Sequence, residues 1–161
     1  MDYIGIDCGL DGAIVRMGDR KIEDKIAMPT INNGKRREID IDKLSSIFES
    51  WGLLDCVLVI EDPGGHAPSA AGLRSMTYSF AVIKTLTIVH RLPYHTVAAR
   101  KWQSAFWSRP GGKYDTKAAA LKAATQIWPD EDWRRNERCK IAFDGFVDAA
   151  LLAEYGRRNN I

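Results

Sequence analysis

Apolar residues fall into two kinds of segment along this chain. Short continuous runs, such as residues 56–60, are bounded by Gly, Pro or acidic residues and are typical of buried strands. Longer segments place apolar residues three or four positions apart, as Ile41, Leu44, Ile47 and Phe48 do, which is typical of amphipathic helices. The short runs predict strands over 2–8, 13–17, 21–28, 55–61 and 94–97. The periodic segments predict helices over 41–52, 70–90, 99–107, from Asp115 or Thr116 to about 127, and over 144–156.

The order of these segments predicts the fold class. A strand hairpin followed by alternating helices and strands favours an α/β fold with a mixed central sheet flanked by helices. With 161 residues, 45% of them hydrophobic, the chain is expected to form a single domain over 1–161. Four segments break the pattern. We expect a polar, basic, exposed loop over 29–38, irregular connections at 62–68 and 109–112, where Pro and Gly cluster, and an irregular basic stretch over 130–141.

Three of the apolar segments carry a carboxylate where hydrophobic packing would not place one. Asp7 ends the first strand, Glu61 ends the strand over 55–61, and Asp148 interrupts the last helix. A buried acid usually has a strong partner, shifts its pKa or binds a cation. Asp7 and Glu61 would also lie at the carboxyl ends of strands, where open α/β sheets place their sites. These positions predict that distant segments converge on an acidic, metal-binding centre.

A fourth carboxylate strengthens this prediction. Asp144 precedes Asp148 by one helical turn, so the two share a helix face and repel each other unless a cation lies between them. An oxygen-only cluster suits Mg²⁺ or Mn²⁺. Two such ions can activate water and stabilise a leaving oxygen in phosphodiester hydrolysis. The alternative is that Asp144 only caps the last helix and that Glu61 pairs with a nearby arginine.

Charge and cysteine content add limits. The net charge of +2 does not identify a partner, although basic clusters that could meet phosphates or simply be solvated occur at 35–37, 100–101, 134–140 and 157–158. Cys8, Cys56 and Cys139 are too widely spaced for a zinc site or a disulfide framework, and the first two are expected to be reduced core thiols. No segment has the length and apolarity of a membrane span, so we expect a cytosolic protein without membrane contact.

Several motifs carry a resemblance to one family. Residues 4–13 (IGIDCGLDGA) resemble the first hairpin of RuvC-like nucleases of the RNase H-like superfamily, and 59–63 (VIEDP) resemble their acidic fourth-strand motif. The segment 144–156 is similar to the closing helix of phage-type and organellar RuvC-like Holliday junction resolvases. Residues 97–102 and 115–117 also resemble parts of that group, so the resemblance spans nearly the whole chain.

The resemblance implies an RNase H-like fold and a crossover junction endodeoxyribonuclease. The family's catalytic metal ligands fall on Asp7, Glu61, Asp144 and Asp148, which would hold two Mg²⁺ ions, with Mn²⁺ able to substitute. Cys8 departs from the proline that often follows the first acid, and Asp144 stands where some relatives have histidine. Neither change removes an oxygen ligand. The resemblance also implies a phage or bacterial source, since an organellar location would require a targeting segment outside this sequence.

Two paired cuts in a four-way junction imply a two-fold homodimer. The candidate interface is the helix over 70–90 with Met76, Phe80 and Ile83, which could equally be a core helix. Lys113 and Lys117 flank a helix N-terminus suited to a phosphate, and Lys117 is expected nearest the scissile phosphate. The remaining candidate DNA contacts are His66, Arg74, Arg100 and Lys101. Among the tryptophans, we expect Trp102 and Trp128 in the core rather than stacked on bases.

Three other classes compete with this interpretation. Sugar-kinase and actin-like ATPases share an Asp-x-Gly hairpin but need two domains and a Gly-rich phosphate loop, for which this chain is too short. Another RNase H-like nuclease, acting on RNA–DNA hybrids or other branched DNA, would keep the same acids but lack the long helix for dimerisation. A catalytically inactive nucleic-acid-binding module is disfavoured because all four acids are present.

Overall fold

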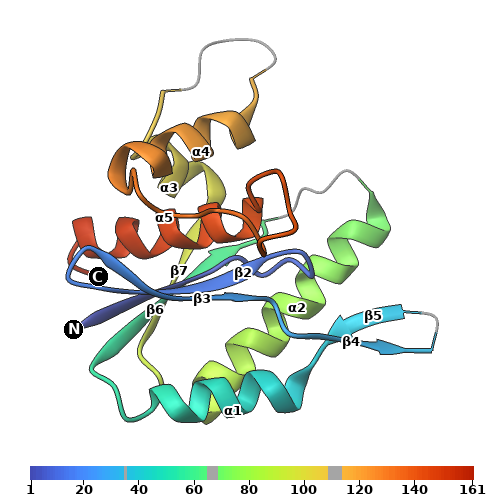
Figure 1. The fold of residues 1–161 in the computed structure, drawn as a ribbon. Coiled ribbons are helices and arrows are strands. Elements are labelled where there is room, and N and C mark those ends of the chain that lie inside the picture. The colour runs from blue at the N-terminus through green and yellow to red at the C-terminus, as the bar shows by residue number, and fades with distance from the viewer. Residues whose placement is uncertain (35, 65–68, 109–113) are drawn as a thin grey trace.

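A mixed five-stranded sheet forms the centre of the protein in the computed structural model, which describes residues 1–34, 36–64, 69–108 and 114–161 (Figure 1). Its strands are β1 (Asp2–Ile6), β2 (Ala13–Gly18), β3 (Lys21–Ala27), β6 (Cys56–Asp62) and β7 (Tyr94–Ala98), in the order β3-β2-β1-β6-β7. The first three strands form an antiparallel meander, and β6 and β7 add to β1 in parallel. The predicted α/β class with a mixed sheet is confirmed.

Helices cover both faces of this sheet (Figure 1). The helices are α1 (Ile41–Trp51), α2 (Ala70–Val89), α3 (Ala99–Ser104), α4 (Thr116–Ile127) and α5 (Asp144–Arg158). Because side chains alternate along a strand, each face of the sheet has its own core. Ile4 and Ile6 of β1 pack with Leu44 and Phe48 of α1, whereas Tyr3 packs in the cluster that includes α4 and α5. In the described ranges, no helix combines the length and apolarity needed to cross a membrane.

A second, two-stranded sheet overturns the loop predicted over 29–38. β4 (Thr30–Asn33) and β5 (Arg36–Ile39) form an antiparallel hairpin that projects beside α2 (Figure 1). Its base is anchored through buried Ile39 and the Asp40 amide, which donates to the Pro29 carbonyl. Because most of its side chains are exposed and polar, the hairpin lacks the apolar alternation that predicts a strand.

Two other boundaries differ from the prediction. Helix α3 ends at Ser104 rather than near 107, because the amides of Phe106 and Trp107 both bond the Gln103 carbonyl and close a tight turn. Helix α5 continues past Gly156 to Arg158. The predicted connection at 109–112 and most of that at 62–68 lie outside the described residues. The stretch over 130–141 is irregular, as expected, and buries Trp133.

Close packing of α5 on β1 depends on glycine. A Cβ at Gly5 would lie 1.8 Å from the Ala149 carbonyl oxygen, and one at Gly145 would lie 2.8 Å from the Asp11 carbonyl oxygen. Both distances are too short for any side chain, so only glycine lets the helix backbone approach the first strand and its turn. This approach brings the acids of α5 to the carboxyl end of β1.

Candidate active site

The register of two parallel strands places the first two acids side by side. Ile6 of β1 is level with Ile60 of β6, so the residues that follow them, Asp7 and Glu61, are neighbours at the carboxyl ends of these two strands. The turn after β1 fixes Asp7 further: its backbone amide donates to the Ala13 carbonyl at 3.0 Å, and its Oδ1 accepts from the Gly9 amide at 3.1 Å.

Helix α5 supplies the other two acids. Asp7, Asp144 and Asp148 line one cavity of about 440 Å³, whose opposite wall includes Ser75 and Met76 of α2. Asp144 is the first residue of α5, and the N-cap position belongs to Phe143. The alternative that Asp144 serves only as a helix cap is therefore wrong.

Burial and mutual repulsion raise the pKa values of these carboxyls. Burial, and next the charge of Asp7, raise the pKa of Glu61 to about 7, although a hydrogen bond from Trp102 opposes the shift. Burial also raises the pKa of Asp7, with smaller contributions from Asp11 and Asp144. The pKa of Asp148 lies well above its ordinary value because of burial and then the charges of Asp7 and Glu61. When all three carboxyls are ionised, the surrounding groups therefore supply too little positive charge to compensate them.

The neighbouring thiol follows the same pattern. Cys8 is buried and free, as expected, and burial followed by the charges of Asp7 and Glu61 raises its pKa well above the ordinary value. A neutral thiol is therefore maintained beside the acids, so Cys8 adds no charge to the centre. Cys56 is likewise buried and free.

Trp102 is a site residue that the sequence did not reveal as one. Its indole is fully buried, as expected of a core tryptophan, but Nε1 donates to Glu61 Oε2 at 2.8 Å. The alternative in which Glu61 pairs with an arginine does not hold among the described residues. The hydrogen bond fixes the orientation of the Glu61 carboxylate from the side of α3.

Lys117 is the predicted basic residue that reaches the centre. Its Nζ lies 2.5 Å from Asp144 Oδ2, and the hydrogen bond to Asp144 raises the pKa of the ammonium. Asp115 caps α4 by accepting from the amides of Lys117 and Ala118, so the helix starts where it was expected, at Asp115 or Thr116. Both partners of the Lys117–Asp144 pair are substantially exposed, so the pair can open for a ligand.

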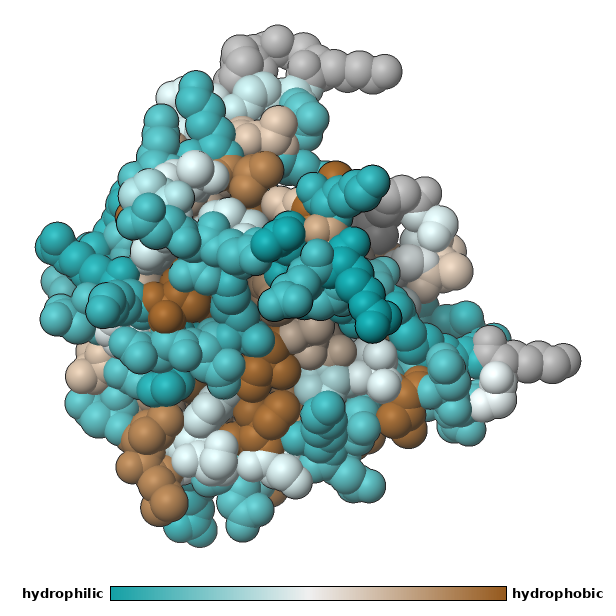
Figure 2. All heavy atoms as spheres, in the orientation of Figure 1, coloured by the Kyte–Doolittle hydropathy of each residue, from teal (hydrophilic) through white to brown (hydrophobic). Residues whose placement is uncertain are grey.

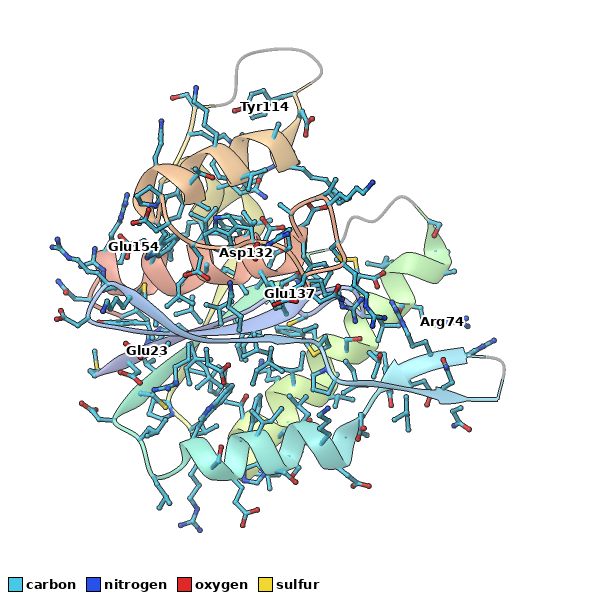
Figure 3. All side chains as sticks on the ribbon, in the orientation of Figure 1. Glu23, Arg74, Tyr114, Asp132, Glu137 and Glu154 are labelled. Carbon is cyan, nitrogen blue, oxygen red and sulfur yellow. The ribbon has the colours of Figure 1, made fainter. Side chains whose placement is uncertain are left out.

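The other predicted DNA contacts divide into three groups. Arg74 lies on α2, on the side that shares a pocket with the β4–β5 hairpin (Figure 3). Arg100 and Lys101 are exposed on α3, and Arg100 lines a different pocket with Trp107, whose described lining includes none of the four acids. His66 and Lys113 lie outside the described residues.

The donor chemistry fits a divalent cation, but the side chains are not arranged around one. The acids offer only oxygen ligands, which hard cations prefer, and the raised pKa values of Asp7, Glu61 and Asp148 reflect a deficit of positive charge. Over the described ranges, no three His, Cys, Asp or Glu side chains are positioned to hold one ion as they stand. Metal binding would therefore require the side chains to reorient, including release of Asp144 from Lys117.

Comparison with solved structures places the fold. No family model and no curated protein matches the sequence. Thermus thermophilus RuvC in complex with a Holliday junction substrate superimposes with a TM-score of 0.63 at 10% identity, covering 99% of this chain and 96% of that one. A second structure of Thermus thermophilus RuvC gives a TM-score of 0.58 at 9% identity, covering 99% and 97%. The expected fold is confirmed: the chain has a RuvC-like, RNase H-like fold.

Proposed function

We propose that this protein is a divalent-metal-dependent endonuclease that resolves four-way DNA junctions. The observation that carries the proposal is the convergence of Asp7, Glu61, Asp144 and Asp148, from β1, β6 and α5, on a RuvC-like fold. One of the structural neighbours, Thermus thermophilus RuvC, is bound to a Holliday junction substrate. Four like-charged carboxylates, of which Asp7, Glu61 and Asp148 have raised pKa values, are costly to bring together unless they bind a cation.

The proposed metal ligands are the four carboxylates. Two Mg²⁺ ions bound there would activate a water molecule and stabilise the leaving oxygen during hydrolysis of a phosphodiester. The chain's own groups orient the centre: Trp102 and the Gly9 amide hold the carboxylates of Glu61 and Asp7. Lys117, once released from Asp144, is free to approach the phosphate that is cut. The resemblance implies products with 5′-phosphate and 3′-hydroxyl ends.

Cleavage assays test the substrate class. Purified protein is incubated with a synthetic four-way junction, a matched duplex and an RNA–DNA hybrid, in Mg²⁺ or in EDTA. We expect symmetric paired cuts in the junction alone, and only with Mg²⁺. Preferential cleavage of the hybrid would instead support the second candidate, an RNase H-like nuclease of RNA–DNA hybrids.

Variant proteins test the centre. Asp7→Asn keeps an acceptor for the Gly9 amide but removes the charge, so we expect a folded, inactive protein. Asp130→Asn, an equally conservative change at an exposed loop position, should cut normally. A thermal-shift titration adds a readout independent of activity, because Mg²⁺ should stabilise the native chain and Asp130→Asn but not Asp7→Asn. Cleavage by Asp7→Asn at the native rate would contradict the proposed catalytic role of the acidic centre.

The proposed assembly is a homodimer, because two symmetric cuts require two centres. In α2, Ile83 is fully buried in the core of its own chain, so it is not available to a partner. Met76 and Phe80 are half-buried, and Tyr78 is exposed on the same helix. Light scattering after size exclusion at the assay concentration tests the dimer. A monomer that still makes paired cuts would contradict it.

A further inference from the structure

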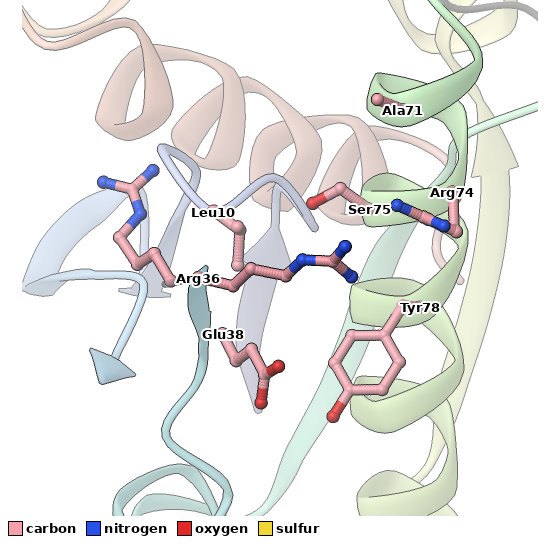
Figure 4. A pocket seen from close by; sticks show the side chains of 8 residues that line it. Leu10, Arg36, Glu38, Ala71, Arg74, Ser75 and Tyr78 are labelled. Atoms are coloured by element: carbon pink, nitrogen blue, oxygen red, sulfur yellow. The ribbon is translucent and has the colours of Figure 1, made fainter. Parts of the chain in front are cut away.

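A second pocket lies beside the acidic cavity, between the β4–β5 hairpin and α2 (Figure 4). Its volume is about 450 Å³, and three arginines line it: Arg36 and Arg37 from the hairpin and Arg74 from α2. We call these three residues and the space between them the basic groove. Leu10, Arg37 and Ser75 line both this groove and the acidic cavity, so the two spaces are contiguous.

The arginines of the groove have uncommitted charge. In the ranges that the structure describes, neither Arg36 nor Arg74 has an ion pair. Arg37 contacts Asp11 at 2.6 Å, but the Asp11 side chain is 76% exposed, and so exposed a pair is weak enough to exchange for a stronger anion. Glu38 is the one acidic side chain among the described lining residues. The groove therefore carries a net positive charge next to a negative centre.

The Arg37–Asp11 pair also connects the groove to the acidic cavity. Asp11 belongs to the turn between β1 and β2, which begins at Asp7, so the pair ties the hairpin to the rim of the acidic cavity. The same exposed, exchangeable pair therefore joins the wall of the groove to the rim of the cavity.

A phosphate backbone passing the acidic centre needs cations on either side of it. Four carboxylates repel each phosphate that approaches, and Lys117 supplies positive charge only from α4. The hairpin and α2 lie on the other face of the sheet from α4 (Figure 1). Arginine suits this role because its planar guanidinium forms two parallel hydrogen bonds to a phosphate. The exposed Tyr78 ring in the same pocket is available to a sugar or base.

We propose that the basic groove binds the phosphodiester backbone of a DNA strand beside the nucleotide held at the acidic centre. This inference rests on the proposed nuclease function and assigns a second DNA-binding element, the β4–β5 hairpin, to the same site. Its substrate class is a continuous strand: the contiguity of groove and cavity favours one backbone crossing both over a separate small phosphorylated ligand.

The test measures binding without cleavage. Affinity of the full chain for the four-way junction, the duplex and single-stranded DNA is measured by fluorescence anisotropy in EDTA over a range of salt. The groove variant is Arg36→Ala/Arg74→Ala, which leaves the Arg37–Asp11 pair intact. The matched control is Lys21→Ala/Lys43→Ala, which removes the same charge at exposed positions outside both pockets. Circular dichroism checks that all variants are folded.

We expect the groove variant to bind about tenfold or more weakly and to reduce the salt slope by about two, one for each phosphate group that the missing arginines would neutralise. The control should stay within about twofold of the native chain at moderate salt. Arg36→Lys/Arg74→Lys should keep the salt slope, since the charges remain. A groove variant that matches the control in both affinity and slope would overturn the inference.

Further outcomes separate this inference from the proposed function. If the native chain cuts junctions while the groove variant binds normally, the inference about the groove is contradicted and the proposed nuclease function is supported. If the native chain cuts no junction, but the Arg36→Ala/Arg74→Ala variant loses binding to single-stranded DNA, the inference about the groove is supported and the proposed junction substrate is contradicted. Competition by inorganic phosphate or a mononucleotide at low concentration, absent in the groove variant, would identify a small-molecule site and overturn the strand assignment.

Discussion

Helix α5 carries two enclosed acids in opposite surroundings. Glu154, near its carboxyl end, is only 2% exposed and accepts hydrogen bonds from both Arg157 and Arg158 (Figure 3 shows its position). Burial would raise the pKa of Glu154, but these two arginines outweigh it and lower that pKa. Asp148, less than two turns earlier, faces other acids, and its pKa is raised well above the ordinary value.

The difference distinguishes a structural acid from a candidate catalytic one. The Glu154 cluster satisfies its own charge within the chain, so it needs nothing from outside. The Asp148 cluster does not, because Asp7 and Glu61 add negative charge, and Lys117, the cation that opposes this charge, is paired with Asp144. A buried charge left without compensation indicates a site that a ligand completes. The surface around both ends of the helix is largely hydrophilic in the view of Figure 2.

The largest expected effect separates the two acids by activity. Asp148→Asn should reduce the rate of junction cleavage by about 1,000-fold, since losing one ligand of a catalytic cation costs several kcal/mol of transition-state stabilisation. The same change should leave the metal-free protein as stable as the native chain or more stable, because it removes a repelling charge. Single-turnover cleavage and chemical denaturation measure the two quantities. Native-like cleavage by Asp148→Asn would contradict the distinction between Asp148 as a catalytic acid and Glu154 as a structural one.

Glu154→Gln should show the reverse pattern. Removing this charge leaves two arginines without their buried partner, and we expect a loss of about 3 kcal/mol in the free energy of unfolding. Cleavage at a temperature well below the new midpoint should stay within about threefold of native. Urea denaturation, analysed with the slope of the native chain, provides the measurement. An undiminished stability would show that the Glu154 cluster is not the compensated one.

The pH dependence of stability gives a third contrast in the metal-free protein. Glu61 has a folded pKa of about 7, against an ordinary value of 4.5, so between these pH values the folded state holds a proton that the unfolded chain has released. Stability therefore falls as pH rises through this window, by about 3 kcal/mol for Glu61 at about 1.4 kcal/mol per pH unit. Asp7 and Asp148 act in the same direction.

Chemical denaturation in EDTA over about pH 4 to 8 measures how the free energy of unfolding changes with pH. Glu61→Gln should flatten this dependence, whereas Glu154→Gln should not, because the lowered pKa of Glu154 contributes stability that is lost only at acidic pH. A metal-free chain that becomes more stable from pH 5 to pH 7 would contradict the assignment of uncompensated charge to the Asp148 cluster.

The contrast between the two clusters also shows what the sequence can and cannot reveal. Asp7, Glu61 and Asp148 were predictable because each interrupts an apolar run, a local signal. Glu154 also ends an apolar run, so the local signal alone does not separate it from the other acids, and the sequence does not show that Arg157 and Arg158 compensate its charge. Burial and pairing depend on tertiary contacts that a single sequence does not display.

The central sheet was predictable for the same local reason, and the hairpin was not. Strands β1, β2 and β6 are mostly buried apolar runs, whereas β4 and β5 expose polar side chains and pair with each other in a separate sheet. The basic groove depends on that hairpin, so its contiguity with the acidic cavity emerged only from the folded chain. Likewise, the role of Gly5 depends on the approach of α5, which lies far away in the sequence.

The smallest expected effect concerns Trp102, which joins the core to the acidic centre across 41 residues of sequence. Trp102→Phe keeps an aromatic ring but removes the donor to Glu61, and a hydrogen bond to a charged group contributes about 1.5 kcal/mol or more. The pKa of Glu61 should then rise by about one pH unit, because this bond opposes the effect of burial. In EDTA, the upper edge of the pH window in which stability falls should move to higher pH by the same amount. Phe106→Leu alters a ring packed on Trp102 without touching that hydrogen bond, so it should lower stability without moving the edge. If both variants leave the edge in place, Trp102 is a packing residue and the acidic centre holds Glu61 without it.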